Sequence, residues 1–201
     1  MSLVGFKAQN HAQQTAARGA RDDVDDRGTE RAFIRDLEKR FRAFTLDVAA
    51  AQHNTKAPRF YTREDDGLSQ SWNRPDPSND FWTRYREHNE MVWCNPPYSD
   101  IRPWVEKAWV EWHGRLPHPG NLNTFPSYPP PTIVMLLPAN RTEQGWWQDL
   151  VEPYRDRLWS PLRVEFLRGR MRFDRPGAVI GPKGDRPPFG CCLLIWEGGA
   201  S

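Results

Sequence analysis

The sequence predicts an α/β protein built on a parallel sheet, and two apolar runs carry this prediction. The run Met91-Val92-Trp93-Cys94 stops at Asn95-Pro96-Pro97-Tyr98. Two prolines donate no backbone hydrogen bonds, so a central strand must end there. The run Thr132–Pro138 is uninterrupted, as in strands that are buried on both faces. Open α/β sheets bind ligands beyond the carboxyl ends of their strands, so we expect function at the Asn-Pro-Pro-Tyr turn (residues 95–98).

The composition indicates one soluble, globular domain. The chain has 201 residues, of which 27% are charged and 38% are hydrophobic, and this length allows a substantial core. No signal peptide or transmembrane run is visible, and the three cysteines have neither metal-ligand nor disulfide spacing. We therefore expect a cytoplasmic protein with reduced, buried thiols. A net charge of +2 means that nucleic-acid contacts have to come from local patches.

The chain divides into a polar arm and one folded domain. Residues 1–28 lack hydrophobic periodicity and are rich in Ala, Gln, Arg and Asp, which is typical of a solvated arm. We expect the domain to occupy residues 29–201. Thr29 can cap its first helix, whose apolar face consists of Phe33, Ile34, Leu37 and Phe41.

Two acids are expected to meet the turn at one edge of the sheet. Asp47 ends the apolar strand Phe44–Val48 and is followed by three alanines that begin at Ala49. A carboxylate at this place can accept hydrogen bonds from a ribose or an amino group, and small residues let a ligand approach the backbone. The segment up to Asp66 has room for a helix, a short strand at Phe60 and a turn. An exposed loop acid is the alternative for Asp47.

The Asn-Pro-Pro-Tyr turn offers the groups that hold a planar amine. The Asn95 side-chain oxygen and the Pro96 carbonyl are hydrogen-bond acceptors, Pro97 keeps the turn rigid, and the Tyr98 ring offers a face to a flat base. A planar amine held in this way is a nucleophile prepared for alkylation. The alternative is a turn that only ends a strand.

A helix after the turn is predicted from an apolar stripe. Ser99 or Asp100 can cap this helix, and its apolar side chains repeat at helical spacing, so we expect them in the core. They are Ile101, Trp104, Val105, Ala108, Trp109 and Trp112. Residues 114–131 follow with six prolines and form a long loop, which is either a DNA-contact insertion or a simple connector.

Four arginines are candidates for DNA contacts. Arg141 follows the strand Thr132–Pro138 and precedes a predicted helix that contains Trp146. A further strand is predicted at Val164–Phe173, and the last one at Cys191–Trp196. In the former, one face carries Arg168, Arg170 and Arg172, and the other carries Leu167, Met171 and Phe173. Arginines placed in this way can follow phosphates, and an ordinary solvated face is the alternative.

Together these motifs resemble the phage-type DNA N-6-adenine methyltransferases. The ordered set extends from about Thr29 to Trp196, and it is more specific than the turn, which several amino-methylating families share. Besides the turn and Asp47 with its alanines, the set comprises Asn54, Lys56, Tyr61-Thr62, Asp66-Gly67-Leu68, Trp72, Val92-Trp93, Trp104-Val105, Lys107-Ala108, Leu136-Leu137-Pro138-Ala139, Trp146-Trp147, Gly169-Arg170, Phe173 and Pro188-Phe189.

The resemblance implies a single Rossmann-like methyltransferase domain with a mostly parallel sheet, flanking helices and an antiparallel C-terminal hairpin. It implies S-adenosylmethionine as the methyl donor, no metal, and an adenine flipped out of double-stranded DNA as the acceptor. Asn95 and Pro96 would bind the 6-amino group, and Tyr98 would stack on the base. The residues that would contact the cofactor are Phe44, Asp47, Ala49 and Asp66. A phage or prophage origin, with the protein in the host cytoplasm, is implied as well.

The chain departs from the family pattern at two places. Family members commonly have Thr-Pro at the helix start, whereas Thr29-Glu30 stands here. Alanines replace the cofactor-loop glycines of broader methyltransferases, so Asp47 could lie on the first or the second cofactor strand. The same turn also serves methylation of cytosine, RNA adenine or protein glutamine, and a DNA-binding protein without catalysis is the alternative from another class. No motif specifies a recognition sequence or an oligomeric state.

Overall fold

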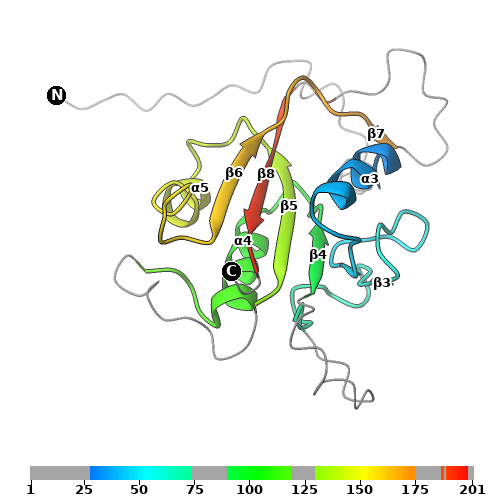
Figure 1. Ribbon diagram of the computed structural model, residues 1–201, viewed down its shortest axis with the longest axis horizontal. Coiled ribbons are helices and arrows are strands. Elements are labelled where there is room, and N and C mark those ends of the chain that lie inside the picture. The colour runs from blue at the N-terminus through cyan, green and yellow to red at the C-terminus, as the bar shows by residue number, and fades with distance from the viewer. Residues whose placement is uncertain (1–27, 74–89, 119–129, 175–186, 188, 199–201) are drawn as a thin grey trace.

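In the residues that the structure describes, the chain is built around a six-stranded, mostly parallel sheet. This computed structural model describes residues 28–73, 90–118, 130–174, 187 and 189–198. The strands of the sheet are β2 (Leu46–Asp47), β3 (Arg59–Phe60), β4 (Met91–Cys94), β5 (Thr132–Pro138), β6 (Leu162–Phe166) and β8 (Cys191–Trp196). Their order is β3-β2-β4-β5-β8-β6 (Figure 1). β8 is antiparallel to both β5 and β6, whereas the other neighbours are parallel.

Two short strands form a second sheet close to the first described helix. β1 (Gly28–Thr29) pairs antiparallel with β7 (Phe173–Asp174), and the helix α3 (Arg31–Arg40) follows β1 almost directly. Figure 1 shows β7 beside α3. This pair therefore joins two segments that are far apart in the sequence.

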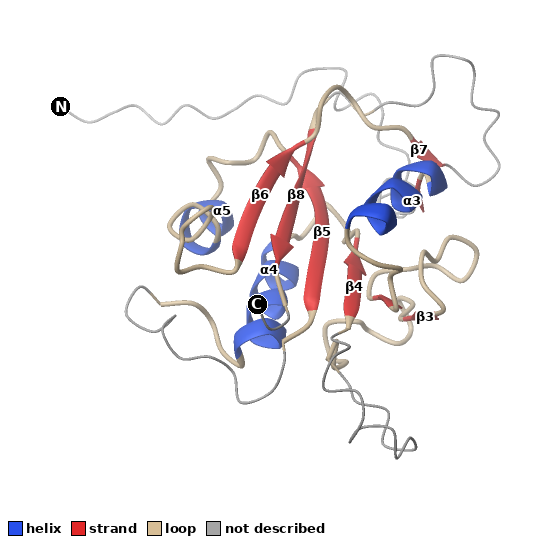
Figure 2. Ribbon diagram, viewed as in Figure 1, coloured by secondary structure: helices blue, strands red, loops and turns tan. Residues whose placement is uncertain are grey.

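Helices cover both faces of the main sheet, because its central strands are apolar on both sides. Besides α3, the described helices are α4 (Arg102–His113) and α5 (Gly145–Leu150), and Figure 2 shows the three helices around the sheet. In β4, Met91 and Trp93 belong to the hydrophobic cluster that includes α3. Val92 and Cys94 belong to the cluster that includes α4 and α5. Successive strand residues face opposite sides, so each helix group has its own apolar layer.

The predicted α/β class and most predicted elements are confirmed. β5 and β8 have the predicted bounds, because both are continuous apolar runs. The helices α3, α4 and α5 occur where helices were predicted. β6 and β8 are antiparallel, as expected, but the chain between them passes through β7, so they do not form a tight hairpin. Most of the loop 114–131 and the arm 1–28 lie outside the described residues.

Thr29 does not cap α3, and this prediction is wrong. The N-cap residue is Glu30, which has an extended backbone and makes no side-chain cap hydrogen bond. Thr29 lies in β1 instead, where it pairs with Phe173 and is only 1% exposed. Pairing with a distant strand, rather than local capping, therefore decides where the Thr29 side chain lies.

Two further local predictions are also wrong. Neither Ser99 nor Asp100 caps α4, because Ile101 occupies the cap position in helical conformation and without a side-chain cap bond. The connection between β2 and β3 contains turns rather than a helix. In one of these turns, the Asn54 side chain accepts a hydrogen bond from the Ala51 amide at 2.8 Å. This local side-chain bond offers the backbone an alternative to a helix.

The predicted strand Val164–Phe173 is too long. β6 ends at Phe166, and residues 167–172 cross to β7 without forming a strand. The sequence alternation continues through the crossing, but Gly169 has a φ angle of +79°. This left-handed conformation interrupts an extended strand and is accessible to glycine at little cost.

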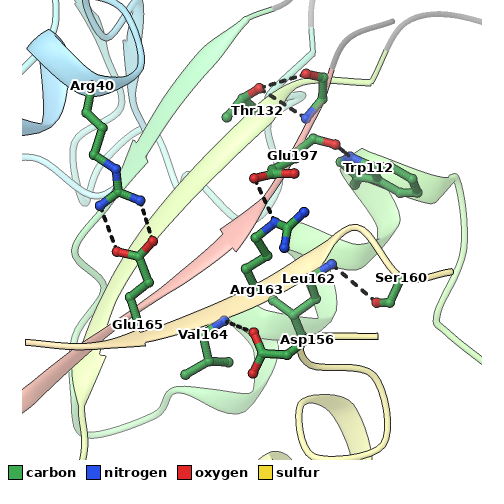
Figure 3. Close-up of polar contacts among 11 residues, drawn as sticks. Arg40, Trp112, Thr132, Asp156, Ser160, Leu162, Arg163, Val164, Glu165 and Glu197 are labelled. Atoms are coloured by element: carbon green, nitrogen blue, oxygen red, sulfur yellow. Dashed lines mark hydrogen bonds and ion pairs between the residues drawn. The ribbon is translucent and has the colours of Figure 1, made fainter. Parts of the chain in front are cut away.

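Side-chain contacts fasten the edge strand β6 to its surroundings (Figure 3). Arg40, at the end of α3, donates hydrogen bonds to both carboxylate oxygens of Glu165. On the other side, the Asp156 carboxylate accepts a hydrogen bond from the Val164 amide at 3.1 Å. Partly exposed ion pairs contribute about 0–1 kcal/mol, so these contacts set the position of β6 more than they stabilise the fold.

Gly67 allows the loop after β3 to lie directly against the end of β2. A Cβ atom at Gly67 would come within 2.1 Å of the Val48 carbonyl oxygen, which is far closer than real contacts. The fully buried Trp72 fastens the loop in place, because its indole N–H donates to the Gly67 carbonyl at 2.7 Å. The shape of this loop therefore depends on the absence of a side chain.

Replacing Gly67 with alanine is expected to destabilise the fold by about 1–3 kcal/mol, the usual cost of forcing extra atoms into a packed site. Urea unfolding measures this change. Gly145→Ala is the control, because a Cβ atom there would meet its nearest neighbour, Arg102, only at 4.0 Å. Equal stabilities of the two variants would contradict the close approach.

Candidate functional site

A pocket of about 820 Å³ opens at the carboxyl edge of the main sheet. We call it the carboxyl-edge pocket. The ends of β2 and β4 and the loops that follow β2, β3 and β4 line it. Its lining includes two of the predicted acids, Asp47 and Asp66, together with Asn95 of the turn. Further lining residues that bear on its chemistry are Thr29, Ala49, Lys56, Trp93, Pro97 and Trp104.

The parallel pairing of β2 with β4 brings the acid and the turn together. Asp47 lies opposite Trp93, so both strands end at the same edge, and Asn95 follows the end of β4. On the other side of β2, the Tyr61 amide donates to the Asp47 carbonyl at 2.9 Å, and the chain continues to Asp66. Among the described residues, β2 is the first strand of the main sheet in chain order.

Asp47 is a buried carboxylate held by backbone amides. It is 2% exposed, and its two oxygens accept hydrogen bonds from the amides of Lys56 at 2.9 Å and Ala49 at 3.4 Å. Burial raises the pKa of Asp47 to about 6, although these amides and the charges of Lys56 and Arg31 lower it. At neutral pH the group is therefore an incompletely compensated anion, which favours a ligand that is cationic or donates hydrogen bonds.

The Asn-Pro-Pro-Tyr turn orders its own side chains and is tied to the chain after β5. The Tyr98 hydroxyl donates to the Asn95 side-chain oxygen at 3.1 Å. An amide oxygen can accept two hydrogen bonds, so this bond does not prevent Asn95 from accepting one from a ligand. Arg141 donates from Nη1 to the Tyr98 backbone carbonyl at 2.8 Å.

The Tyr98 side chain is half-buried among aromatic rings and thiols. Its ring makes edge contacts with Phe173 and Phe189, at centroid distances of 6.4 and 6.1 Å. Burial, and to a smaller extent the neighbouring thiols of Cys191 and Cys192, raises the pKa of Tyr98 well above its ordinary value. The phenol therefore stays protonated and remains a hydrogen-bond donor at neutral pH.

Five of the eight residues predicted to be catalytic or to bind the cofactor line the carboxyl-edge pocket. Those that line it are Asp47, Ala49, Asp66, Asn95 and Pro97. Tyr98 is joined to it through its bond to Asn95, whereas Pro96 is buried and outside the lining. Phe44 is also outside the lining and packs against Trp93 with ring centroids 5.4 Å apart, so it supports the pocket wall from the core.

The four candidate arginines lie in two different environments. Arg168, Arg170 and Arg172 are exposed on the segment that runs from β6 to β7, and Figure 1 shows this segment crossing above the sheet toward α3. Arg141 is half-buried and bonded to the turn. The sequence grouped these residues by charge, but only the first three are directed to solvent.

Three pocket residues were not expected from the sequence to be there. The Thr29 hydroxyl is buried without a hydrogen-bond partner in the described part of the chain. Lys56 is only 7% exposed, and its place in the motif set was the one signal that pointed to it. Trp104 stacks on Trp72, with ring centroids 6.1 Å apart, so one member of the stripe predicted as core also forms a pocket wall.

Known proteins share the sequence of this region. Residues 17–118, just over half of the chain, match the family of DNA N-6-adenine-methyltransferases (Dam). The chain belongs to this family. The matched part of this Dam family member contains Asp47, Asp66 and the Asn-Pro-Pro-Tyr turn.

Two phage proteins are relatives of this Dam family member. The DNA N-6-adenine-methyltransferase of Escherichia phage T1 is 28% identical over 131 residues, which are 65% of this chain and 42% of the phage protein. The enzyme of that name from Haemophilus phage HP1 is 34% identical over 65 residues, which are 32% and 29% of the two chains. The chain therefore spans less than half the length of these relatives. No solved structure matches it.

The described residues of this Dam family member contain neither a membrane-spanning helix nor a cluster of metal-binding side chains. None of the helices in these residues is long and apolar enough to cross a membrane. The same residues contain no group of three or more His, Cys, Asp or Glu side chains that could hold a metal ion.

Removing the Asp47 charge is expected to change how stability depends on pH. The pKa of Asp47 is raised from 3.8 to about 6 on folding, so between these two values the folded protein binds more protons than the unfolded chain, and stability falls as the pH rises toward about 6. Asp47→Asn removes this titration. The wild type should therefore lose stability relative to the variant as the pH rises from about 4 to about 6, with little further change above that range, as measured by urea unfolding.

The control for this prediction is Asp65→Asn, which should not share the trend. The Thr62 amide and hydroxyl both donate to Asp65 and lower its pKa. A constant stability difference between wild type and Asp47→Asn across this pH range would show that the Asp47 carboxylate is not penalised by burial.

Proposed function

We propose that this chain is a DNA methyltransferase that transfers a methyl group from S-adenosylmethionine to the 6-amino group of adenine. The observation that carries the proposal is that the Asn-Pro-Pro-Tyr turn opens into the same pocket as Asp47 and Asp66. Asn95, which can bind an amine, and the carboxylates of Asp47 and Asp66, which suit the methyl donor, thus line one pocket. Membership of the Dam family and the two phage relatives support this reaction, and the strand order supports a Rossmann-like methyltransferase domain.

The carboxyl-edge pocket fits the donor in size and chemistry. Its volume of about 820 Å³ lies within the usual range for small-molecule sites. Asp47 and Asp66 can accept hydrogen bonds from the ammonium and ribose groups, and the buried Thr29 hydroxyl can complete its hydrogen bonding with a polar ligand atom. Trp104 offers an apolar wall. When bound, S-adenosylmethionine supplies a methyl group on a positively charged sulfur, which a neutral amine can attack.

Asn95 holds the acceptor amine in this proposal. Its side-chain oxygen and the Pro96 carbonyl accept hydrogen bonds from the 6-amino group, which draws the nitrogen lone pair out of the ring and favours a tetrahedral nitrogen. The Tyr98 hydroxyl fixes the orientation of the Asn95 amide at 3.1 Å, and the Tyr98 ring stacks on the base. The protein thereby supplies position and electrostatics to the reaction.

The target adenine reaches the turn only outside the double helix, because the reacting amino group is inaccessible within the stack. A base flipped toward Asn95 brings its flanking phosphates to the carboxyl edge of the sheet. The exposed residues Arg168 and Arg170, on the crossing segment above this edge, have the charge and position to contact these phosphates.

The first prediction of this proposal concerns Asn95. Wild-type protein should transfer the methyl group of isotope-labelled S-adenosylmethionine to unmethylated DNA, with N-6-methyladenine as the product after digestion to nucleosides. Asn95→Ala should lower turnover by about 10²-fold or more, the usual effect of removing one positioned hydrogen-bonding group. Cofactor binding, measured by calorimetry, should survive. Tyr98→Phe is the comparison variant: it keeps the ring and removes only the bond to Asn95, so turnover should fall less than in Asn95→Ala.

Other outcomes of this experiment identify the alternatives. Unchanged turnover in Asn95→Ala would remove Asn95 from the mechanism. Cofactor binding without transfer to DNA would indicate another planar amine, such as one in RNA or protein. Absence of both binding and transfer would indicate a DNA-binding protein without catalysis.

The second prediction concerns the crossing segment. Changing both Arg168 and Arg170 to alanine should weaken DNA binding and reduce the slope of log K against log salt by about 2, because each phosphate contact contributes about 0.9. Arg163→Ala is the control, since Arg163 lies near the start of β6 and donates to Glu197 at 2.8 Å. An equal slope in the double variant and in Arg163→Ala would contradict a phosphate contact at this segment.

A further inference from the structure

The Asn-Pro-Pro-Tyr turn needs support from outside its own backbone. Pro96 and Pro97 have no backbone N–H, so they cannot anchor the turn by donating hydrogen bonds. β4 ends at Cys94 and α4 begins only at Arg102, which leaves the turn between two regular elements. The bond from Tyr98 to Asn95 lies within the turn and cannot fix it relative to the sheet.

Arg141, three residues after the end of β5, contacts the turn. Its Nη1 donates to the Tyr98 carbonyl oxygen at 2.8 Å, across 43 positions of sequence. β5, which Arg141 follows, lies beside β4 in parallel register, so the two strands end at the same edge. The Arg141 guanidinium, at the carboxyl end of β5, therefore reaches the turn that follows β4.

The segment that carries Arg141 is itself held firmly. The Ala139 amide donates to the Gly190 carbonyl at 2.9 Å, and the Gln144 amide donates to the Arg141 carbonyl at 3.2 Å. Trp146 then begins the buried face of α5. The half-buried Arg141 side chain thus extends from a segment with its own backbone hydrogen bonds, whereas Arg170 is exposed on the crossing segment, which forms no strand.

We propose that Arg141 is a positioning residue for methyl transfer. By holding the Tyr98 carbonyl, its guanidinium fixes the turn so that the Asn95 side-chain oxygen and the Tyr98 ring keep the orientation that receives the base. This role differs from the phosphate contact that the charge of Arg141 suggested. It rests on the proposed function, since the turn is the site that receives the acceptor base there.

The kinetic test compares Arg141→Ala and Arg141→Lys with wild type. Arg141→Ala should lower kcat for methyl transfer by about 10–100-fold, because small displacements of a reacting group cost up to about 10²-fold. Cofactor affinity and the salt slope of DNA binding should stay unchanged. Arg141→Lys should restore part of kcat, because an ammonium can donate to the same carbonyl but lacks the planar guanidinium.

Two exposed arginines are the matched controls. Arg170→Ala should lower the salt slope of DNA binding by about 1, and Arg163→Ala should leave both kcat and the salt slope unchanged. A reduced salt slope in Arg141→Ala, with kcat equal to that of wild type, would overturn the proposal in favour of a phosphate contact. An unchanged kcat together with an unchanged slope would overturn it as well.

A measurement that does not need activity separates this proposal from the proposed function. The chain has five tyrosines, which can be replaced by 3-fluorotyrosine and followed by fluorine NMR, with the Tyr98 signal assigned from Tyr98→Phe. Arg141→Ala should shift or broaden that signal, and Arg163→Ala should not. If the wild type transfers no methyl group to DNA, the proposed function fails. An unshifted Tyr98 signal in Arg141→Ala overturns the positioning role whether or not transfer occurs.

Discussion

The parallel pairing of β2 with β4 is the constraint on which the site depends. These strands are short, but their register places Asp47 opposite Trp93, so a buried acid and the residue that begins the turn leave the sheet at the same edge. The loop after β3 joins them only because Gly67 can approach the Val48 carbonyl. A change of register by one residue would turn Asp47 to the opposite face of the sheet and separate the acid from the turn.

Elements whose environment is uniform along their length could be predicted from the sequence. β5 and β8 are covered on both faces, so they are continuous apolar runs with clear ends. The role of Thr29 could not be predicted, because a distant partner, Phe173, draws it into β1. The break in the strand predicted up to Phe173 depends on the backbone conformation of Gly169, which the alternation of side chains does not reveal.

In the candidate site, too, some residues could be placed from the sequence and others could not. Asp47 and Asn95 could be predicted because each follows an apolar run, and parallel strands end at a common edge. Lys56 and Arg141 could not be assigned in this way, since the direction of a long side chain depends on the groups around it. Arg141 bonds to the turn, whereas Arg168 is directed to solvent, although the sequence presents both as cations near strand ends.

The three cysteines are buried close to the Tyr98 side chain of the turn. Cys94 lies at the end of β4, and Cys191 and Cys192 begin β8. Burial raises the pKa of Cys94 well above its ordinary value and that of each β8 thiol to about 12. Because the thiolate is the form that oxidants and electrophiles attack, these side chains act as small apolar groups that resist chemical modification. The Asn-Pro-Pro-Tyr turn thus has sulfur beside it that stays in the thiol form at neutral pH.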